Sequence, residues 1–404
     1  MRISKHQAHL SYCSNIHAGE SWDATFENLK KYTTKVRDGL KAESFGIGLR
    51  LSSEASLELL GGNHLAIFKN WLASENMYVF TINGFPYGGF HNQVVKDQVH
   101  TPDWSTPDRL LYTIRLFDIL AELLPDGLDG GVSTSPISYR FWYKDAAALK
   151  DVKAVAVRQL SLLLIHLAEI KTKTGKSLHL DMEPEPDGIL ETSDEFVNFF
   201  NEDLLPAGKN QISTALGISP TEGEEIIREH FQLCYDVCHF AVGFEKPADA
   251  IAKVKAANIR IGRIQISAAL SSGILGSPED RAVIQEQLKR FDEPTYLHQA
   301  VVRKTDGALV RYKDLGPGLV DIQREDFQEI RTHFHVPVFT EKYEKLISTQ
   351  QDIVDTLKVW KEENFTNHLE VETYTWDVLP KAMQTDIVSC VVRELDWVRT
   401  VATA

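Results

Sequence analysis

The sequence predicts an α/β fold, a (β/α)8 TIM barrel of eight parallel strands. Short apolar segments alternate with amphipathic ones along the 404 residues. Strands that are separated by helices run parallel and are joined by right-handed crossovers. Eight such units are counted, and eight close into a barrel. A doubly wound open sheet is the alternative, but no glycine-rich phosphate loop follows the first strand.

The expected strands are short and regularly spaced. They cover residues 10–16, 46–51, 78–82, the neighbourhood of 132, 178–182, 232–237, 261–267 and 369–374. Helix signals lie between them. Ser21 is expected to cap the first helix, Pro107 suits the first turn of another, and Gly175 suits a C-terminal cap.

The segment between the seventh and eighth strands is too long for one helix. Residues 296–302 and 308–312 flank Thr305-Asp306-Gly307, which predicts a β-hairpin, and residues 332–339 predict one more strand. We therefore expect an inserted hairpin and strand block over about 268–350 that folds over the mouth of the barrel. The whole chain, 1–404, is expected to be a single barrel domain.

The composition, 43% hydrophobic and 25% charged, is that of a globular protein. A net charge of -14 without a long basic run argues against nucleic acid as a partner. Four cysteines in a chain of this length do not make a disulfide framework, so reduced thiols and a cytoplasmic location are expected. No apolar stretch is long enough to anchor the chain in a membrane.

Strand parity predicts where the polar groups gather. Alternate side chains of a barrel strand face the interior. On the fifth strand this inward set is His179, Asp181 and Glu183; Asp236 and Gln265 have the same parity on the sixth and seventh. The inward set thus becomes polar toward the C-terminal mouth, where barrel enzymes have their active sites.

Three carboxylates end strands at that mouth. Glu183, Asp236 and Glu372 close the fifth, sixth and eighth strands; Glu185 lies one step above Glu183, and Trp376 follows Glu372. Burying several unpaired carboxylates is costly, so such a cluster needs a cation, bound protons or water. Solvated loop carboxylates or internal salt bridges are the alternative interpretation.

Several histidines are candidate partners of these carboxylates. His333 and His335 form a His-x-His pair on one strand face, and His239 follows Asp236 by three residues. His298 and His17 are weaker candidates. Carboxylates and imidazoles are ligands of Mg, Mn and Zn, so the expected cofactor is a divalent metal of unknown identity. The chain has neither a GxSxG elbow, an HExxH motif nor a Walker motif.

This pattern resembles the xylose-isomerase-like barrels, which include sugar isomerases, ketose epimerases and an apurinic endonuclease branch. In those proteins a Glu after the fifth strand, an Asp-x-x-His after the sixth and a Glu on the eighth bind a divalent metal. Glu183, Asp236 with His239, and Glu372 match these places.

One position departs from that resemblance. The superfamily has a metal-binding His on the seventh strand, where this chain has Gln265. Glutamine is a poor ligand for a transition metal. Either His298, His333 or His335 replaces the missing imidazole, or the metal is weakly bound or absent.

A longer resemblance, over nearly the whole chain, is to the EboE family of metabolite traffic proteins, which are encoded in bacterial gene clusters linked to secondary metabolites. It implies a pathway and not a reaction, and within it Asn83 to Tyr87 would form a rigid loop at the mouth. The matching segments are residues 11–17, 81–87, 333–337 and 370–376.

Three functions compete. The first is a metal-dependent isomerase, epimerase or related lyase acting on a hydroxy-carbonyl metabolite. As the resemblance to ketose epimerases implies, Glu183 and Glu372 would move a proton and His239 would bind a substrate oxygen. The residues assigned to substrate binding are His17, Asn83, Tyr87, Glu185, Gln265 and Trp376.

The second is a non-catalytic barrel that binds a metabolite through Tyr87, Trp376 and Phe85. The third is a phosphodiesterase of the endonuclease branch, which the negative charge of the chain disfavours. In the first two functions the expected partner is a small-molecule metabolite. The sequence is compatible with a homodimer.

Overall fold

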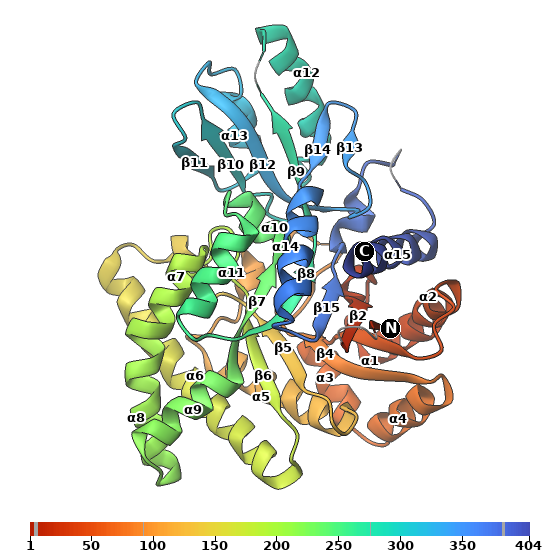
Figure 1. Ribbon diagram of the computed structural model, residues 1–404, viewed down its shortest axis with the longest axis vertical. Coiled ribbons are helices and arrows are strands. Elements are labelled where there is room, and N and C mark those ends of the chain that lie inside the picture. The colour runs from red at the N-terminus through yellow and green to blue at the C-terminus, as the bar shows by residue number, and fades with distance from the viewer. Residues whose placement is uncertain (4–6, 92, 275, 382–383) are drawn as a thin grey trace.

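The computed structural model describes residues 1–3, 7–91, 93–274, 276–381 and 384–404. Eight parallel strands form the barrel, with its outer helices around it (Figure 1). In barrel order the strands are β2 (Ala8–Tyr12), β3 (Phe45–Arg50), β4 (Met77–Asn83), β5 (Gly130–Thr134), β6 (Leu178–Met182), β7 (Phe231–Asp236), β8 (Ile261–Ile266) and β15 (His368–Val371). The predicted (β/α)8 barrel is therefore confirmed.

The barrel closes between its first two strands through a side chain. The backbone pairing of β2 with β3 is recorded as one parallel bridge, Cys13 to Gly48. The Ser11 hydroxyl donates to the Gly46 carbonyl at 2.7 Å and accepts from the Gly48 N–H at 2.8 Å. Ser11 thus satisfies backbone groups that a regular ladder would pair.

The outer layer comprises helices that follow the strands in turn. These are α1 (Trp22–Asn28), α2 (Thr34–Gly39), α3 (Ser53–Leu60), α4 (His64–Ser74), α5 (Pro107–Leu123), α6 (Ala146–Thr174), α7 (Ser193–Asn198), α8 (Leu205–Leu216), α9 (Pro220–His230), α10 (Val237–Val242), α11 (Pro247–Ala256), α14 (Gln350–Glu363) and α15 (Ile387–Thr403). Three predicted boundary signals are confirmed. The Ser21 side chain caps α1, Pro107 begins α5, and Gly175 ends α6 with a positive φ of 74°.

The insertion forms a second, six-stranded antiparallel sheet that rises above the barrel in Figure 1. Its order is β11 (Leu309–Tyr312), β10 (Ala300–Lys304), β12 (Phe327–Val336), β9 (Ala268–Gly273), β14 (Leu346–Ser348) and β13 (Lys342–Tyr343). Helices α12 (Pro278–Leu288) and α13 (Leu315–Asp321) accompany it. The predicted hairpin is present as β10 and β11, and the predicted further strand is β12.

The lower half of the barrel interior is ionic. Arg263 on β8 is fully buried and donates to Asp181 and Glu370, at 3.0 Å each. Its Nη2 donates to the carbonyls of Ile82 and Gly131. One cation and two carboxylates are therefore held by direct bonds directly below the mouth.

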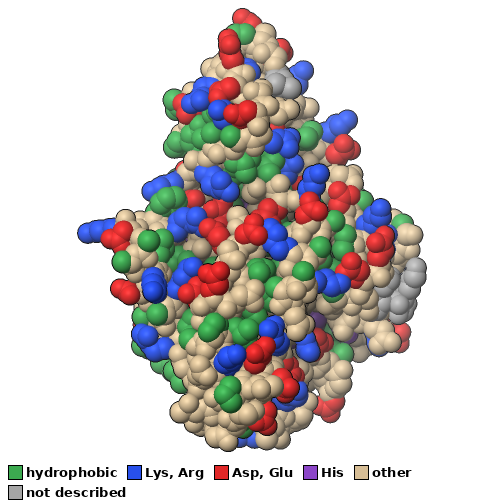
Figure 2. Space-filling view, turned by 60° about the vertical axis from the view of Figure 1, so that its left-hand side comes forward, with side chains coloured by type: hydrophobic (Ala, Val, Ile, Leu, Met, Phe, Trp, Pro, Cys, Tyr) green, Lys and Arg blue, Asp and Glu red, His purple; other side chains and the backbone are tan. Residues whose placement is uncertain are grey.

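All four cysteines, Cys13, Cys234, Cys238 and Cys390, are buried free thiols, as expected. Among the described residues, no helix combines the length and the apolar character needed to cross a bilayer. On the face seen in Figure 2, acidic and basic side chains are interspersed, in line with a diffuse negative charge.

Candidate active site

The three strand-end carboxylates meet at the C-terminal mouth. Glu183 follows β6, Asp236 ends β7 and Glu372 follows β15. All three are buried, and each offers an oxygen within 4.8 Å of the others. Strand parity had placed these side chains on the inner face, and the structure brings them together there.

Gln265 lies at the centre of this cluster. Its Nε2 donates to Glu372 Oε2 at 2.5 Å and to Glu183 Oε1 at 3.0 Å, and it is 3.4 Å from Asp236 Oδ2. Its Oε1 accepts from the Cys234 thiol at 2.9 Å. The amide thus contacts all three carboxylates through a single nitrogen.

Two asparagines fix the outer oxygen of Glu372. Asn15 Nδ2 donates to Glu372 Oε1 at 2.7 Å, and Asn83 Nδ2 donates to the same oxygen at 3.1 Å. Asn83 was expected at the site, whereas Asn15 had no assigned role. The inward parity of Asn15 was the available signal, although β2 ends at Tyr12 and Asn15 lies in a 3₁₀ turn, Ser14–Ile16.

His239 approaches the carboxylates from the sixth strand. Asp236 caps the short helix α10 by accepting from the His239 N–H at 3.1 Å, which fixes the spacing of the two side chains. His239 Nδ1 bonds the Pro184 carbonyl at 2.9 Å, and Nε2 lies 3.8 Å from Asp236 Oδ2.

The insertion supplies two more imidazoles. The pairing of β12 with β9 shifts register between Thr332 and Val336, and such irregularities commonly re-aim side chains beside active sites. His333 Nε2 lies 3.1 Å from His239 Nε2, and His335 Nδ1 lies 3.6 Å from Glu372 Oε2. Asp236, His239 and His335 form one candidate metal-binding group, and Glu185, His239 and His333 form another.

Burial and mutual repulsion set the protonation of these groups. Burial, together with Glu372 and Asp236, raises the pKa of Glu183 well above its ordinary value. Burial and the charge of Asp236 raise the pKa of Glu372 to about 8. Burial lowers the pKa of His335 to about 4, so that its ring is a neutral, potential metal ligand.

The donor set fits a divalent cation. Glu183 Oε2 and His335 Nε2 are buried without a hydrogen-bond partner among the described residues. Buried polar atoms are normally bonded, so unsatisfied atoms beside clustered carboxylates point to an additional ligand. Carboxylate oxygens and neutral imidazoles are the donors that Mg, Mn and Zn take in proteins.

Chelator-treated protein is expected to lose stability as the pH rises from 4.5, the ordinary pKa of a glutamate, to about 8, the pKa of Glu372 in the fold. In that range the folded chain keeps a proton on Glu372 that the unfolded chain has released, so the free energy of unfolding falls with pH. Glu372→Gln should flatten this slope by up to about 1.4 kcal/mol per pH unit.

Urea unfolding at a series of pH values measures this slope in wild type and in Glu372→Gln. Glu27→Gln is the control, because the Glu27 side chain is 73% exposed. Equal slopes in wild type and Glu372→Gln would contradict the prediction.

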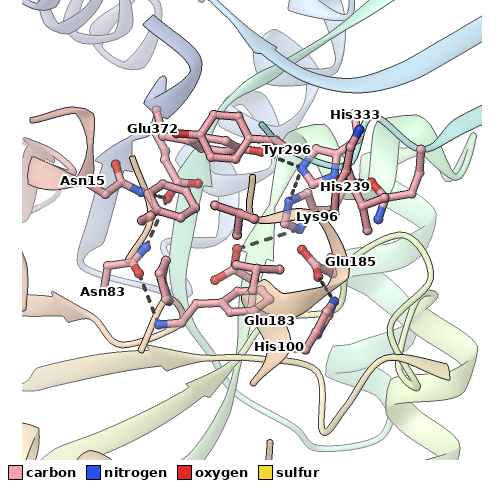
Figure 3. A pocket seen from close by; sticks show the side chains of 18 residues that line it. Asn15, Asn83, Lys96, His100, Glu183, Glu185, His239, Tyr296, His333 and Glu372 are labelled. Carbon is pink, nitrogen blue, oxygen red and sulfur yellow. Dashed lines mark hydrogen bonds and ion pairs between the residues drawn. The ribbon is translucent and has the colours of Figure 1, made fainter. Parts of the chain in front are cut away.

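A pocket opens above the carboxylates, with about 550 Å³ between its walls when the solvent at its mouth is included. Figure 3 shows Asn15, Asn83 and Glu372 on one side and His239, His333 and Glu185 on the other. The polar lining residues are Asn15, Asn83, Lys96, His100, Glu183, Glu185, His239, Gln299, His333 and Glu372. The aromatic ones are Phe85, Phe90, Tyr296 and Tyr374.

His100 and Tyr374 are lining residues that had no predicted role. His100 Nε2 lies 2.8 Å from Glu185 Oε1, and the Tyr374 hydroxyl lies 3.4 Å from His333 Nε2. His100 belongs to the connection between β4 and α5. Connections of that kind form the active face of a barrel, and this was the signal that could have pointed to it.

Four predicted site residues lie elsewhere. His298 is buried behind β12, where Nδ1 bonds the His333 carbonyl and Nε2 bonds Glu293, so it does not supply the missing imidazole. His17 stacks on Tyr32 and bonds the Tyr12 hydroxyl, outside the central pocket. Its place differs from the expectation because the chain has left β2, and strand parity no longer applies.

Tyr87 and Trp376 are the other two predicted site residues that lie outside the central pocket. Tyr87 packs on Tyr112 and beside Arg109, next to the pocket but not in its lining. Trp376 lies in a 3₁₀ turn, Tyr374–Val378, and lines a separate hollow with Phe339. The strand β15 ends at Val371, and Trp376 lies beyond it in this turn.

No family model matches the chain, and no curated protein matches it. The resemblance to the EboE family therefore has no support from these comparisons. Solved structures that match are xylose-isomerase-like barrels and related proteins.

Three of these solved structures match nearly the whole chain. One is a xylose isomerase-like TIM barrel protein from Mycobacterium smegmatis in complex with magnesium, 14% identical over 98% of this chain and 96% of that chain, TM-score 0.48. Another is the IOLI protein with a zinc atom, 11% identical over 98% of both chains, TM-score 0.47. A third is a D-tagatose 3-epimerase-like protein, 9% identical over 98% of both chains, TM-score 0.49.

Proposed function

We propose that this protein is a metal-dependent isomerase or epimerase that acts on a polar hydroxy-carbonyl metabolite. The observation that carries the proposal is the convergence of Glu183, Asp236 and Glu372, with His239 and His335 beside them, next to a pocket that Glu183, Glu372 and His239 line. Burying carboxylates this close together costs free energy, and groups with such perturbed protonation cluster at functional sites.

The residues that would hold the cation are Glu183, Asp236 and Glu372, with His335 as the imidazole that the seventh strand lacks. When bound, a divalent cation would supply Lewis-acid stabilisation of negative charge on substrate oxygens. Asn15, Asn83 and Gln265 orient the carboxylates through the hydrogen bonds described above.

Glu183 and Glu372 are the candidate acid and base. Both bond the same Gln265 nitrogen, so their carboxylates face one small volume from two sides. In the metal-free chain both carboxyl groups have raised pKa values, so each holds a proton more readily than an ordinary glutamate does. His239 and the His100–Glu185 pair are placed to bind substrate hydroxyls.

The pocket wall excludes water from the reacting atoms. Tyr374, Phe90 and Tyr296 pack against one another, with ring centroids 5.1–5.3 Å apart, and cover one side of the pocket. A wall of this kind lowers the local dielectric and strengthens each electrostatic contact at the site. It also gives an apolar surface against which a carbon skeleton can pack.

Gln265 favours a second candidate, a non-catalytic barrel that binds a metabolite. Its amide nitrogen donates hydrogen bonds to the carboxylates that would otherwise face a cation. These bonds offset part of the repulsion between the carboxylates without a metal. The resemblance to EboE, with its link to metabolite traffic, belongs with this candidate or with an enzyme of the same pathway.

Metal content and proton exchange together test the proposal. Purified protein, refilled with Mn or Zn and dialysed, is analysed by inductively coupled plasma mass spectrometry. It is then incubated in D₂O with a panel of ketoses and other hydroxy-carbonyl compounds. We expect bound metal that Glu183→Gln diminishes, and NMR-detected deuterium at the carbon beside the carbonyl of at least one compound.

Glu394→Gln is the matched control, because it changes a buried carboxylate that bonds Thr373 and the Val338 N–H outside the pocket. It should keep both properties. If wild type binds no metal at the carboxylates and exchanges no proton, the enzyme proposal fails and the binding barrel replaces it.

A further inference from the structure

A second cluster of imidazoles and carboxylates lies at the opposite end of the barrel. His179 is the second residue of β6, His368 is the first residue of β15, and Asp129 immediately precedes β5. All three therefore lie at the N-terminal ends of strands, away from the pocket. Each offers a ligand atom within 4.8 Å of the others.

The ligand atoms of this cluster that face one another do not form hydrogen bonds with one another. Asp129 Oδ2 lies 3.8 Å from His179 Nε2, and Asp129 Oδ1 lies 3.6 Å from His368 Nε2. Both distances are too long for hydrogen bonds. Neither nitrogen has a hydrogen-bond partner in the part of the chain that the structure describes, although His179 and His368 are only 2% and 1% exposed.

The other side of His179 is fixed as it is in many metal sites. Its Nδ1 bonds Asp181 Oδ1 at 2.6 Å, and Asp181 Oδ2 accepts from Arg263 at 3.0 Å. A carboxylate on one ring nitrogen holds the tautomer in which the other nitrogen carries a lone pair. Nε2 then faces the Asp129 carboxylate, and either a proton on Nε2 or a metal cation between the two groups satisfies both of them.

Two glycines make room for this arrangement. A Cβ atom at Gly262 would lie 1.8 Å from Asp181 Oδ1, and one at Gly131 would lie 2.6 Å from His179 Cε1. The neighbouring strands thus lack side chains where the His179–Asp181 pair lies. The Asp129 side chain is 42% exposed and gives an ion a route from solvent.

We infer that His179, His368 and Asp129 bind a divalent transition metal such as zinc at the N-terminal end of the barrel. Ligand atoms of a tetrahedral zinc ion lie about 3.3 Å apart, so closing the two Asp129–imidazole distances by about half an ångström brings each of these pairs to zinc spacing, with water as the fourth ligand. The ion would join β6, β15 and the segment before β5. This site is independent of the reaction proposed for the mouth.

An anomalous difference map from crystals grown with zinc chloride, recorded at the zinc absorption edge, locates the ion directly. We expect a peak bounded by His179 Nε2, His368 Nε2 and an Asp129 oxygen. A map with zinc at the mouth and no peak here would overturn the inference.

Equilibrium dialysis against zinc gives a second test, in a Glu183→Gln, Glu372→Gln, His239→Gln background that removes at least one ligand from each candidate group described at the mouth. We expect His368→Gln to weaken zinc binding at least tenfold. Asp129→Asn, at a partly exposed position, should do the same if His368→Gln fails to fold. Asp126→Asn, an exposed aspartate three residues earlier, is the control and should bind like the background. Unchanged affinity in a folded His368→Gln or Asp129→Asn variant would show that the cluster is only an internal ion pair.

Discussion

Glu372→Gln is expected to lower the rate of substrate proton exchange by at least about 10³-fold while the fold survives. Glutamine keeps the shape of the side chain and its oxygen can still accept from Asn15 and Asn83, but it can neither take a proton nor offer a charged oxygen to a cation. Loss of turnover with retained structure would therefore report the chemistry of the carboxyl group.

The rate is measured as deuterium incorporation from D₂O into the compound on which wild type acts, with circular dichroism and thermal unfolding as checks on the fold. Glu394→Gln, with its buried carboxylate outside the pocket, should retain the wild-type rate. Full activity in Glu372→Gln would remove this residue from the mechanism.

Arg263→Met is expected to have the largest effect on stability, a loss of about 3–5 kcal/mol. The substitution leaves Asp181 and Glu370 buried without their cation, and it removes the hydrogen bonds from Arg263 to the carbonyls of Ile82 and Gly131. The barrel would have to protonate both carboxylates or admit water.

Chemical unfolding of wild type and Arg263→Met measures the loss. Arg324→Met is the control: Arg324 is half-exposed and pairs with Asp326 at the surface, where an ion pair contributes about 0–1 kcal/mol. Adding Asp181→Asn and Glu370→Gln to Arg263→Met should recover part of the stability, because it removes the uncompensated charges. A loss of less than about 1 kcal/mol in Arg263→Met would contradict the assigned role.

Strand parity could be predicted from the sequence because it follows from backbone geometry alone. His179, Asp181 and Glu183 lie on the inner face as predicted, and Gln265 lies beside the carboxylates. The same rule misplaced His17, since β2 ends before that residue and a turn does not preserve the alternation.

Long-range placement could not be read from local pattern. The His-x-His spacing of His333 and His335 predicted that both rings share a face, but not that a register shift would bring them to the carboxylates. His298 was a candidate metal ligand for the same chemical reason, yet its ring stacks on Phe334, on the other face of that strand. Which face of an inserted sheet meets the barrel depends on packing between segments far apart in sequence.

The continuity of β8 with β9 restricts how the pocket can be reached. A single residue, Ser267, separates the barrel strand from the inserted sheet, and its hydroxyl donates to Asp236 at 2.6 Å. The next strand of that sheet, β12, carries His333 and His335. The inserted sheet therefore cannot swing away as a hinged cover without pulling Asp236 and both imidazoles out of place. We expect a metabolite to enter instead from the side, past pocket-lining side chains that include Phe85, Phe90, Val95, Val99, Tyr296 and Leu297.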